Sequence, residues 1–167
     1  MIFSLLLFLY TNSFAQNFIL KDDLIDIRAK DKIVEIGSEV KTKTGVNIYV
    51  YSTSSFNLDK DISTKDKIEY IKNYELDILK NLETPYVIIT ISLEDTHVNL
   101  YYSDTLEKII DKNEILDDYV VPLLASKDKN TVASKVSASV LNGYAAVADK
   151  LADSKNVELE SNIGNQG

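Results

Sequence analysis

YVIITISL, at Tyr86–Leu93, is followed by the polar triplet EDT (94–96) and then by HVNLYY, at His97–Tyr102. A nearly continuous apolar run is typical of a strand that is buried on both faces of a sheet, so helices should cover the sheet on both sides. The triplet predicts a tight turn, and HVNLYY predicts a second strand that returns antiparallel to the first. The two strands make the expected sheet mixed rather than purely parallel.

The segments before this hairpin alternate between helical and extended patterns. An apolar stripe at steps of four, three and four residues predicts a helix over residues 29–44, and Gly45 then stands where a helix usually ends. The next seven residues, VNIYVYS at 46–52, predict a strand. Residues 64–82 predict a second helix, capped by Ser63 or Thr64. A strand, helix and strand in this order predict a parallel crossover.

The segments after the hairpin are predicted to be helical: a short helix at 104–110, another at 113–125 that Pro122 kinks, and a long one at 130–153. The expected architecture is α/β, a single-domain α/β/α sandwich with a small mixed sheet flanked by helices, over residues 17–153. Residues 154–167 are polar and resemble a linker to a membrane anchor beyond Gly167.

The N-terminus has the features of a secretory signal peptide. Ile2–Tyr10 is uncharged and apolar but too short to span a bilayer, which takes about 20 helical residues. Ser13 and Ala15 follow at the −3 and −1 positions of a small-residue cleavage site. We therefore expect residues 1–15 to be removed on export. The alternative is a buried N-terminal strand.

Composition excludes several kinds of site. The chain of 167 residues has 18 Lys and Arg against 26 Asp and Glu, a net charge of −8, which disfavours binding to nucleic acid. It has no Cys, so thiol nucleophiles and Cys-based metal sites are excluded. His97 is its only histidine and opens a hairpin strand, where we expect an ordinary surface residue. No glycine-rich phosphate loop is present.

Acidic residues gather after the second strand of the hairpin. If residues 104–111 are helical, Asp104, Glu107 and Asp111 share one face, and Glu114 follows in the next segment. Oxygen ligands of this kind suit Ca²⁺ or Mg²⁺. The alternative is a solvated helix face, since lysines are interspersed with the acids.

The chain resembles the TPM-domain family, α/β domains that are exported or face a lumen and are often tethered by a membrane helix. Three stretches carry the resemblance: DDLI at 22–25 followed by a helix that ends in KTGVNIYV (43–50), the hairpin VIITISLEDTHVNL (87–100), and LE at 106–107 followed by VVPLL at 120–124. Where the family usually carries Trp-Gly-x-Gly before the hairpin, this chain has YELDIL, residues 74–79. The family's Gly-x-Gly before the Leu-Glu pair is replaced by YSDT, residues 102–105.

The resemblance implies a candidate site and two functions. Some family members are acid phosphatases with bound Ca²⁺, which implies a metal site at Asp22 or Asp23, Glu107, and Asp111 or Glu114. The loss of the family's glycines favours instead a non-catalytic module that binds a protein partner in the cell envelope. For a Gram-negative host, the expected location is the periplasm, at or near a membrane. A divalent-metal-dependent phosphatase and a Ca²⁺-binding structural domain are the alternatives.

Overall fold

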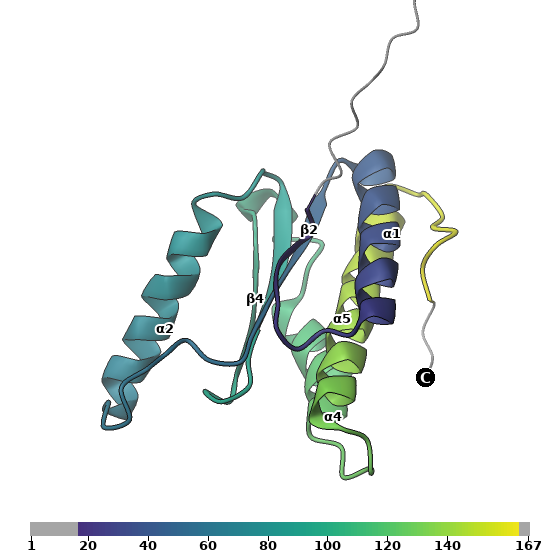
Figure 1. Ribbon diagram of the computed structural model, residues 1–167. Helices are drawn as coiled ribbons and strands as arrows, with labels where there is room; N and C mark the ends of the chain where they lie inside the picture. Colours follow the sequence, from purple (N-terminus) through teal and green to yellow (C-terminus); the bar gives the residue numbers. More distant parts are fainter. Residues whose placement is uncertain (1–16, 164–167) are drawn as a thin grey trace, which may run out of the picture.

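The computed structural model describes residues 17–163, which form one α/β domain with a four-stranded mixed sheet (Figure 1). The strands lie in the order β1-β2-β3-β4, where β1 to β3 are mutually parallel and β4 is antiparallel to β3. Their bounds are β1 Ile19–Asp22, β2 Asn47–Thr53, β3 Tyr86–Ser92 and β4 His97–Tyr102. The predicted parallel pairing across a helix and the antiparallel hairpin are both confirmed.

Helices α1 (Ile27–Thr44) and α5 (Val132–Ser154) cover one face of the sheet, and helix α2 (Thr64–Leu79) lies on the other (Figure 1). The predicted α/β/α sandwich is therefore confirmed. Asp26 caps α1 by accepting a hydrogen bond from the backbone of Ala29 at 3.0 Å. Gly45 ends the helix in the left-handed conformation, with φ of 78°, as expected for a glycine in this place.

The hydrophobic core lies between the sheet and the α1–α5 layer. Tyr144 of α5 is fully buried there, and its hydroxyl donates to the carbonyl of Ile48 in β2 at 2.8 Å. Gly37 lets α1 approach this point, because a Cβ at that position would overlap the Tyr144 hydroxyl and lie 2.9 Å from Phe18 Cδ2. Apolar side chains at alternate positions of β2 and β3 form the sheet side of this core.

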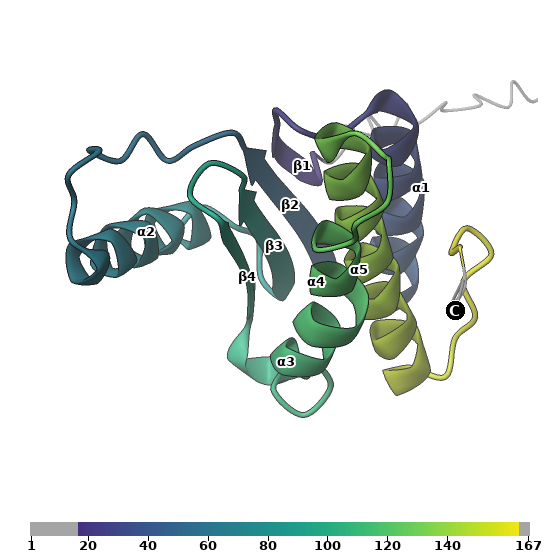
Figure 2. The same cartoon turned by 90° about the horizontal axis from the view of Figure 1, so that it is seen from below.

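Helix α2 packs much less closely than α1 and α5. Of its residues only Ile71 and Glu75 are buried, whereas Ile68, one turn before Ile71, is 64% exposed. Figure 2 shows α2 standing off the sheet, joined to β2 by the extended segment of residues 54–63. The layer exists as predicted, but hydrogen bonds and a few aromatic contacts hold it rather than a continuous apolar stripe.

Two segments differ from the sequence-based expectation. Strand β1 was not predicted, because four residues at the edge of a sheet are too few to show an alternating pattern. The helix expected over residues 104–110 is wrong: only a 3₁₀ turn, Asp104–Leu106, forms there. Asp111 instead caps a new helical segment by accepting from the backbone of Asn113 and Glu114.

The helical stretch that contains Pro122 is irregular, as predicted. Helix α3 (Lys112–Glu114) runs through a π-helical turn at Ile115–Val120 into helix α4 (Val121–Leu124). A proline lacks the backbone N–H that an α-helix needs, so the hydrogen-bond pattern changes one turn before Pro122. The stretch packs against α5 beside the hairpin (Figure 2).

The C-terminal residues as far as residue 163 are docked on the helices. Glu39 of α1 accepts hydrogen bonds from Lys43 at 2.6 Å, from the backbone N–H groups of Glu160 and Ser161 at 2.8 Å each, and from the Ser161 hydroxyl. Asn162 donates to the carbonyl of Ala145 at 3.1 Å. The segment that resembles a linker in the sequence thus runs along α1 in Figure 1.

The predicted signal peptide, residues 1–15, lies outside the described residues. Within residues 17–163, none of the helices combines the length and the apolarity that a membrane crossing requires.

Acid is expected to release the docked C-terminal segment. Burial raises the pKa of Glu39, but hydrogen bonds from Lys43, Ser161 and the Glu160 backbone outweigh it and lower the pKa from 4.5 to about 2. Since the folded pKa lies below the unfolded one, the stabilisation is complete above pH 4.5 and is lost as the pH falls towards 2.

The Glu39→Gln variant tests this contact. It should lose about 2 kcal/mol of unfolding free energy, and the Ser161 amide should exchange faster with solvent. Hydrogen-exchange NMR and urea unfolding measure both effects. Glu35→Gln, on the exposed side of the same helix, is the matched control and should change neither. Unchanged protection of Ser161 in Glu39→Gln would contradict the assignment.

Candidate functional site

A buried carboxylate joins α2 to the sheet. Glu75 lies on the inward side of α2 and is only 1% exposed, and four side chains of β3 and β4 donate hydrogen bonds to it. Its Oε1 accepts from the Thr90 hydroxyl and from His97 Nε2, the latter at 2.7 Å. Its Oε2 accepts from Asn99 Nδ2 at 3.1 Å and from the Tyr101 hydroxyl at 2.7 Å. The carboxylate is therefore fully satisfied and almost entirely buried.

The alternation of the strands places these four donors on one face. Thr90 projects towards α2 from the centre of β3, and His97, Asn99 and Tyr101 occupy alternate positions of β4. The register pairs Thr90 directly with Asn99. The polar residues of the two strands thus form a single patch whose donors all reach the Glu75 carboxylate.

The donors keep Glu75 ionised. Burial raises the pKa of Glu75, but the hydrogen bonds from His97, Thr90 and Tyr101 outweigh this effect and lower the pKa below its ordinary value of 4.5. Burial and the bond to Glu75 together raise the pKa of Tyr101, so its hydroxyl remains a donor. The cluster is a buried anion held by neutral donors and one imidazole.

His97 is held by Glu75 rather than free on the surface. Because an ionised carboxylate only accepts, Nε2 carries the proton in this bond. The side chain is 23% exposed and lies edge-on to the Phe56 ring, with 5.8 Å between ring centroids. Its Nδ1 has no hydrogen-bond partner within residues 17–163. The expectation of an ordinary surface histidine is therefore wrong.

Aromatic rings fill the space between α2 and β2. The Phe56 ring lies 5.0 Å from the Tyr74 ring, and the hydroxyls of Tyr51 and Tyr74 are 2.7 Å apart. Phe56 is held in turn by Asp95, whose Oδ2 accepts from the Phe56 backbone at 2.7 Å and from the Ser92 hydroxyl at 2.5 Å. The β3–β4 turn and the segment before α2 are thereby fixed to one another.

A hollow of about 550 Å³ lies between α2 and β4, beside the Glu75 cluster. Lys67, Ile68 and Lys72 line it from α2, and His97 and Tyr101 line it from β4. Its volume is in the range of small-molecule pockets. It combines cationic, apolar and hydrogen-bonding side chains.

Helix α2 exposes several large apolar side chains, of which Tyr70 and Leu76 lie on its outward side, Ile68 lines the hollow and Tyr74 contacts Phe56. Four of the ten exposed large hydrophobic residues among residues 17–163 belong to this one helix: Ile68, Tyr70, Tyr74 and Leu76. Charged and polar residues, among them Glu69 and Asp77, lie between them. A surface that exposes several apolar residues on one helix is typical of a protein interface.

The six acidic residues predicted as metal ligands lie at two different ends of the sheet. Asp22 pairs in register with Ser52 at the carboxyl end of the parallel strands, and Asp23 follows it there. Asp104 follows β4, whose last residue, Tyr102, pairs with Val87 near the opposite end. One metal ion therefore cannot be held by both groups.

Most of these carboxylates already bind protein donors. Asp22 pairs with Lys30, and Asp23 accepts from the Ser54 backbone and the Thr53 hydroxyl, each at 3.3 Å. Glu114 pairs with Lys150 of α5 at 2.8 Å.

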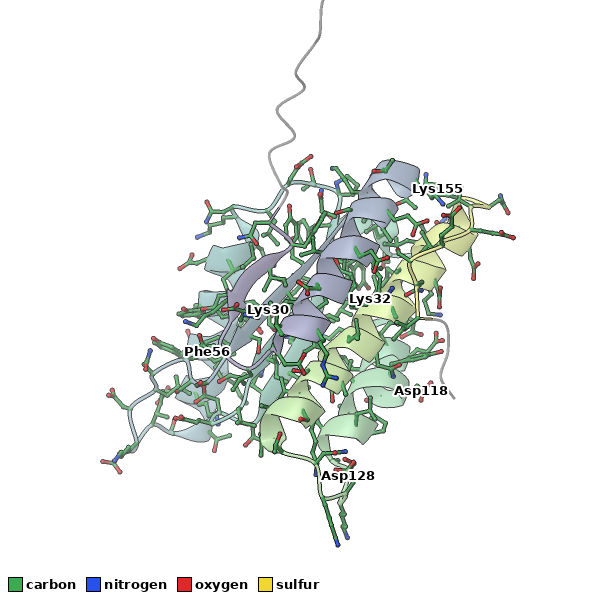
Figure 3. All side chains as sticks on the ribbon, turned by 45° about the vertical axis from the view of Figure 1, so that its right-hand side comes forward. Lys30, Lys32, Phe56, Asp118, Asp128 and Lys155 are labelled. Atoms are coloured by element: carbon green, nitrogen blue, oxygen red, sulfur yellow. The ribbon has the colours of Figure 1, made fainter. Side chains whose placement is uncertain are left out.

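Asp104, Glu107 and Asp111 do not share a helix face, because the expected helix over 104–111 does not form. Within the part of the chain that the structure describes, no three Asp, Glu or His side chains are grouped so that they could hold a metal ion. Figure 3 shows Phe56, in the segment before α2, and Asp118, in the π-helical turn at Ile115–Val120, on opposite sides of the molecule.

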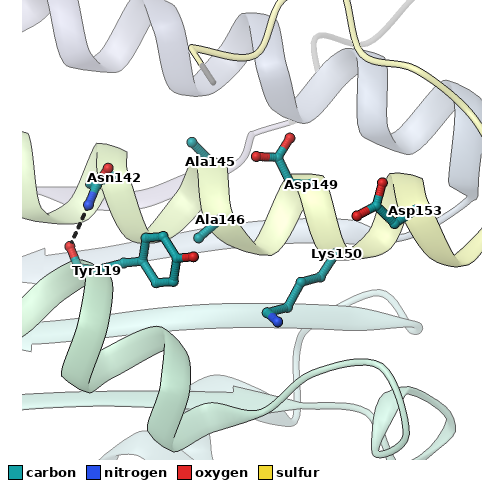
Figure 4. A pocket seen from close by; sticks show the side chains of 7 residues that line it. All are labelled: Tyr119, Asn142, Ala145, Ala146, Asp149, Lys150 and Asp153. Carbon is teal, nitrogen blue, oxygen red and sulfur yellow. Dashed lines mark hydrogen bonds between the residues drawn. The ribbon is translucent and has the colours of Figure 1, made fainter. Parts of the chain in front are cut away.

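A second, smaller hollow of about 190 Å³ lies along α5 (Figure 4). Asn142 donates to the backbone carbonyl of Tyr119 at 2.9 Å, and Figure 4 shows Asp149 and Lys150 pointing away from each other. Asp149 accepts from Asn162 of the docked C-terminal segment at 2.5 Å. The polar groups of this hollow serve packing, so the Glu75 cluster and the adjoining larger hollow are the better candidate site.

The comparisons with known proteins show the fold. No protein-family model and no curated protein matches the chain. The solution NMR structure of the N-terminal domain of a protein from P. gingivalis is similar, with a TM-score of 0.61 at 13% identity, over 87% of this chain and 88% of that one. The NMR structure of the BA42 protein from the psychrophilic bacterium Bizionia argentinensis has a TM-score of 0.46 at 14% identity, over 85% of this chain and 95% of that one.

The sequence analysis did not identify Glu75 and His97 as partners. One signal was present: Glu75 falls at the three- and four-residue spacing of the apolar stripe of its helix, where a carboxylate needs a buried partner. The partners come from strands 15 to 26 residues further on, so only the pairing of the sheet identifies them.

Replacing Glu75 by Gln should destabilise the domain. The Gln amide nitrogen cannot accept, so donors on one side of the cluster lose their acceptor, at a cost of about 1–3 kcal/mol. Since the folded pKa of Glu75 lies below 4.5, its contribution is present above that pH and lost below it. Glu75→Gln should therefore reduce the acid sensitivity of stability.

Urea unfolding followed by circular dichroism at several pH values measures this effect. Glu69→Gln, exposed on the same helix, is the matched control and should stay within about 0.5 kcal/mol of the parent. Equal unfolding midpoints for Glu75→Gln and Glu69→Gln would show that the cluster contributes nothing to stability.

Proposed function

We propose that this chain is an exported, TPM-like domain of the cell envelope that acts as a non-catalytic module binding a protein partner through α2. The observation that carries the proposal is the outward surface of α2, where Tyr70 is 43% exposed and Leu76 39% exposed. Family membership is supported by the similarity of fold to the P. gingivalis domain, together with the sequence resemblance. The periplasmic location and a tether near the membrane belong to the same proposal.

The internal construction of α2 supports an interface on its outward side. The Glu75 cluster anchors the helix from within, so the apolar residues outside are not needed to hold it. Exposed apolar side chains cost solubility, and on a well-anchored helix a partner that covers them offsets that cost. Tyrosine is also enriched at interfaces, because its ring is apolar and its hydroxyl can bond at the rim.

The metal-dependent phosphatase remains the alternative from the sequence, and no specific contact favours it. The carboxylates that it would use lie at two ends of the sheet and largely bind lysines or backbone N–H groups. A Ca²⁺-binding structural domain, the other alternative, would use the same carboxylates as ligands.

Export is tested at the N-terminus. When the 167-residue chain is produced in a Gram-negative host, the periplasmic fraction should contain a form that begins at Gln16, as determined by mass spectrometry. Ala15→Lys should block cleavage and leave the longer form. A cytoplasmic chain of full length in both cases would contradict export.

Partner binding is tested by a photo-crosslinking amino acid at position 70 in the bacterium that makes the protein. We expect one discrete adduct, whereas the same amino acid at Val34, exposed on α1, should form none. The partner identified by the crosslink is then purified, and its affinity for this chain is measured by calorimetry. Tyr70→Ser with Leu76→Ser should weaken it about tenfold or more.

Ile27→Ser with Val34→Ser removes an apolar pair from α1 that is at least as exposed, and is the matched control. It should leave the affinity unchanged. An equal loss of affinity in both double variants, or no loss of affinity in the α2 variant, would contradict an interface on α2.

A further inference from the structure

We propose that the hollow between α2 and β4 binds a small organic anion through the ammonium groups of Lys67 and Lys72, with the His97 ring beside it. The site lies on a different side of α2 from Tyr70 and Leu76, so it is independent of the proposed protein interface. The inference rests on how Glu75 holds His97, on the charges that line the hollow, and on its apolar part.

Glu75 turns His97 so that one ring nitrogen is available. Nε2 donates to Glu75 Oε1 at 2.7 Å, which leaves Nδ1 as the nitrogen without a protein partner among the described residues. His97 lines the hollow and its side chain is 23% exposed, so a ligand can reach the ring. The ring therefore reports on any ligand that enters the hollow.

The two ammonium groups in the hollow still have N–H donors to offer, whereas the oxygens of its two carboxylates already accept from protein donors. Two carboxylates line it, but Glu75 accepts from four side chains, and the Asp95 side chain accepts from the Phe56 backbone and from Ser92. Lys67 donates only to the backbone carbonyl of Asp95, at 2.8 Å. Lys72 is exposed and forms no ion pair within residues 17–163.

Ammonium groups at an opening favour the binding of an anion there, even though the whole chain has a net charge of −8. A carboxylate or phosphate group would suit the two lysines equally.

The apolar part of the hollow selects for a carbon body. Ile71, which is buried, and Ile68, which is 64% exposed, line the same side of the hollow as the lysines. A ligand that covers Ile68 removes apolar surface from water, and a bare inorganic anion cannot. The volume of about 550 Å³ accommodates a molecule of the size of a substituted aromatic acid.

The single histidine makes the test direct. In ¹H NMR of the 167-residue chain, the imidazole Cε1–H resonance belongs to His97 without further assignment. The probe is benzoate, with benzamide as the neutral molecule of the same shape and inorganic phosphate as the anion without a carbon body. All titrations are matched in pH and ionic strength. Benzoate should shift the resonance saturably, whereas benzamide should not, and phosphate should bind more weakly.

Two further measurements identify the contacts. In the ¹⁵N-labelled chain, benzoate should move the Nδ1 resonance of His97 more than Nε2, which remains bonded to Glu75. Lys72→Gln should weaken benzoate binding about fivefold, the effect of one charge near the ligand at the protein surface. Lys65→Gln is the matched control, because Lys65 is an exposed lysine of α2 outside the hollow.

The outcomes that overturn the proposal are distinct. No saturable shift with benzoate refutes the site, and an equal shift with benzamide refutes recognition of charge. If phosphate binds as tightly as benzoate, the hollow does not select for a carbon body. If Lys72→Gln and Lys65→Gln have equal effects, Lys72 does not contact the ligand. Tyr70→Ser with Leu76→Ser should leave benzoate binding unchanged, so failure of the protein interface and failure of this site are separable.

Discussion

The Glu75 carboxylate is the contact on which the second helical layer depends. Most three-layer domains hold each helix by an apolar stripe, and α1 and α5 follow that rule here. Helix α2 does not, because its only fully buried side chains are Ile71 and Glu75. One anion that accepts four hydrogen bonds from β3 and β4 adds to the few apolar contacts of this helix. An ionised group in that place is costly unless all its acceptor positions are used, and they are.

The two faces of the sheet differ as a consequence. The face towards α1 and α5 is closed and packed around Tyr144, with Gly37 allowing the close approach of α1. The face towards α2 carries Thr90, Asn99 and polar aromatic residues, and retains an open hollow at its β4 side. The packed hydrophobic core lies on the first face, and the groups available to a ligand or a partner lie on the second.

The two proposals concern opposite sides of the same helix. The outward side of α2 exposes Tyr70 and Leu76 between charged residues, which suits a protein surface. The side towards β4 carries Lys67 and Lys72 over a hollow that His97 lines from β4, which suits a small anion. Because the Glu75 cluster fixes the helix, both sides are presented by a rigid element rather than by a loop.

The sequence by itself determined the elements whose signal is local. The run YVIITISL, its turn and HVNLYY predict the hairpin, and the apolar stripe of residues 29–44 with Gly45 predicts α1, since periodicity and capping act over a few residues. It could not show β1, which is too short to have a pattern, and it wrongly extended the turn after Asp104 into a helix. The acidic residues within that expected helix do not come together for the same reason.

Only the tertiary structure decided where the polar side chains meet. Strand pairing brings Thr90 beside Asn99, and the crossover returns α2 over them, so that Glu75 and His97, 22 residues apart, share a hydrogen bond. The same applies to Glu39 and Ser161, which are 122 residues apart. Such pairs leave almost no trace in a single sequence, because the bond depends on the path of the chain and not on the residues between its partners.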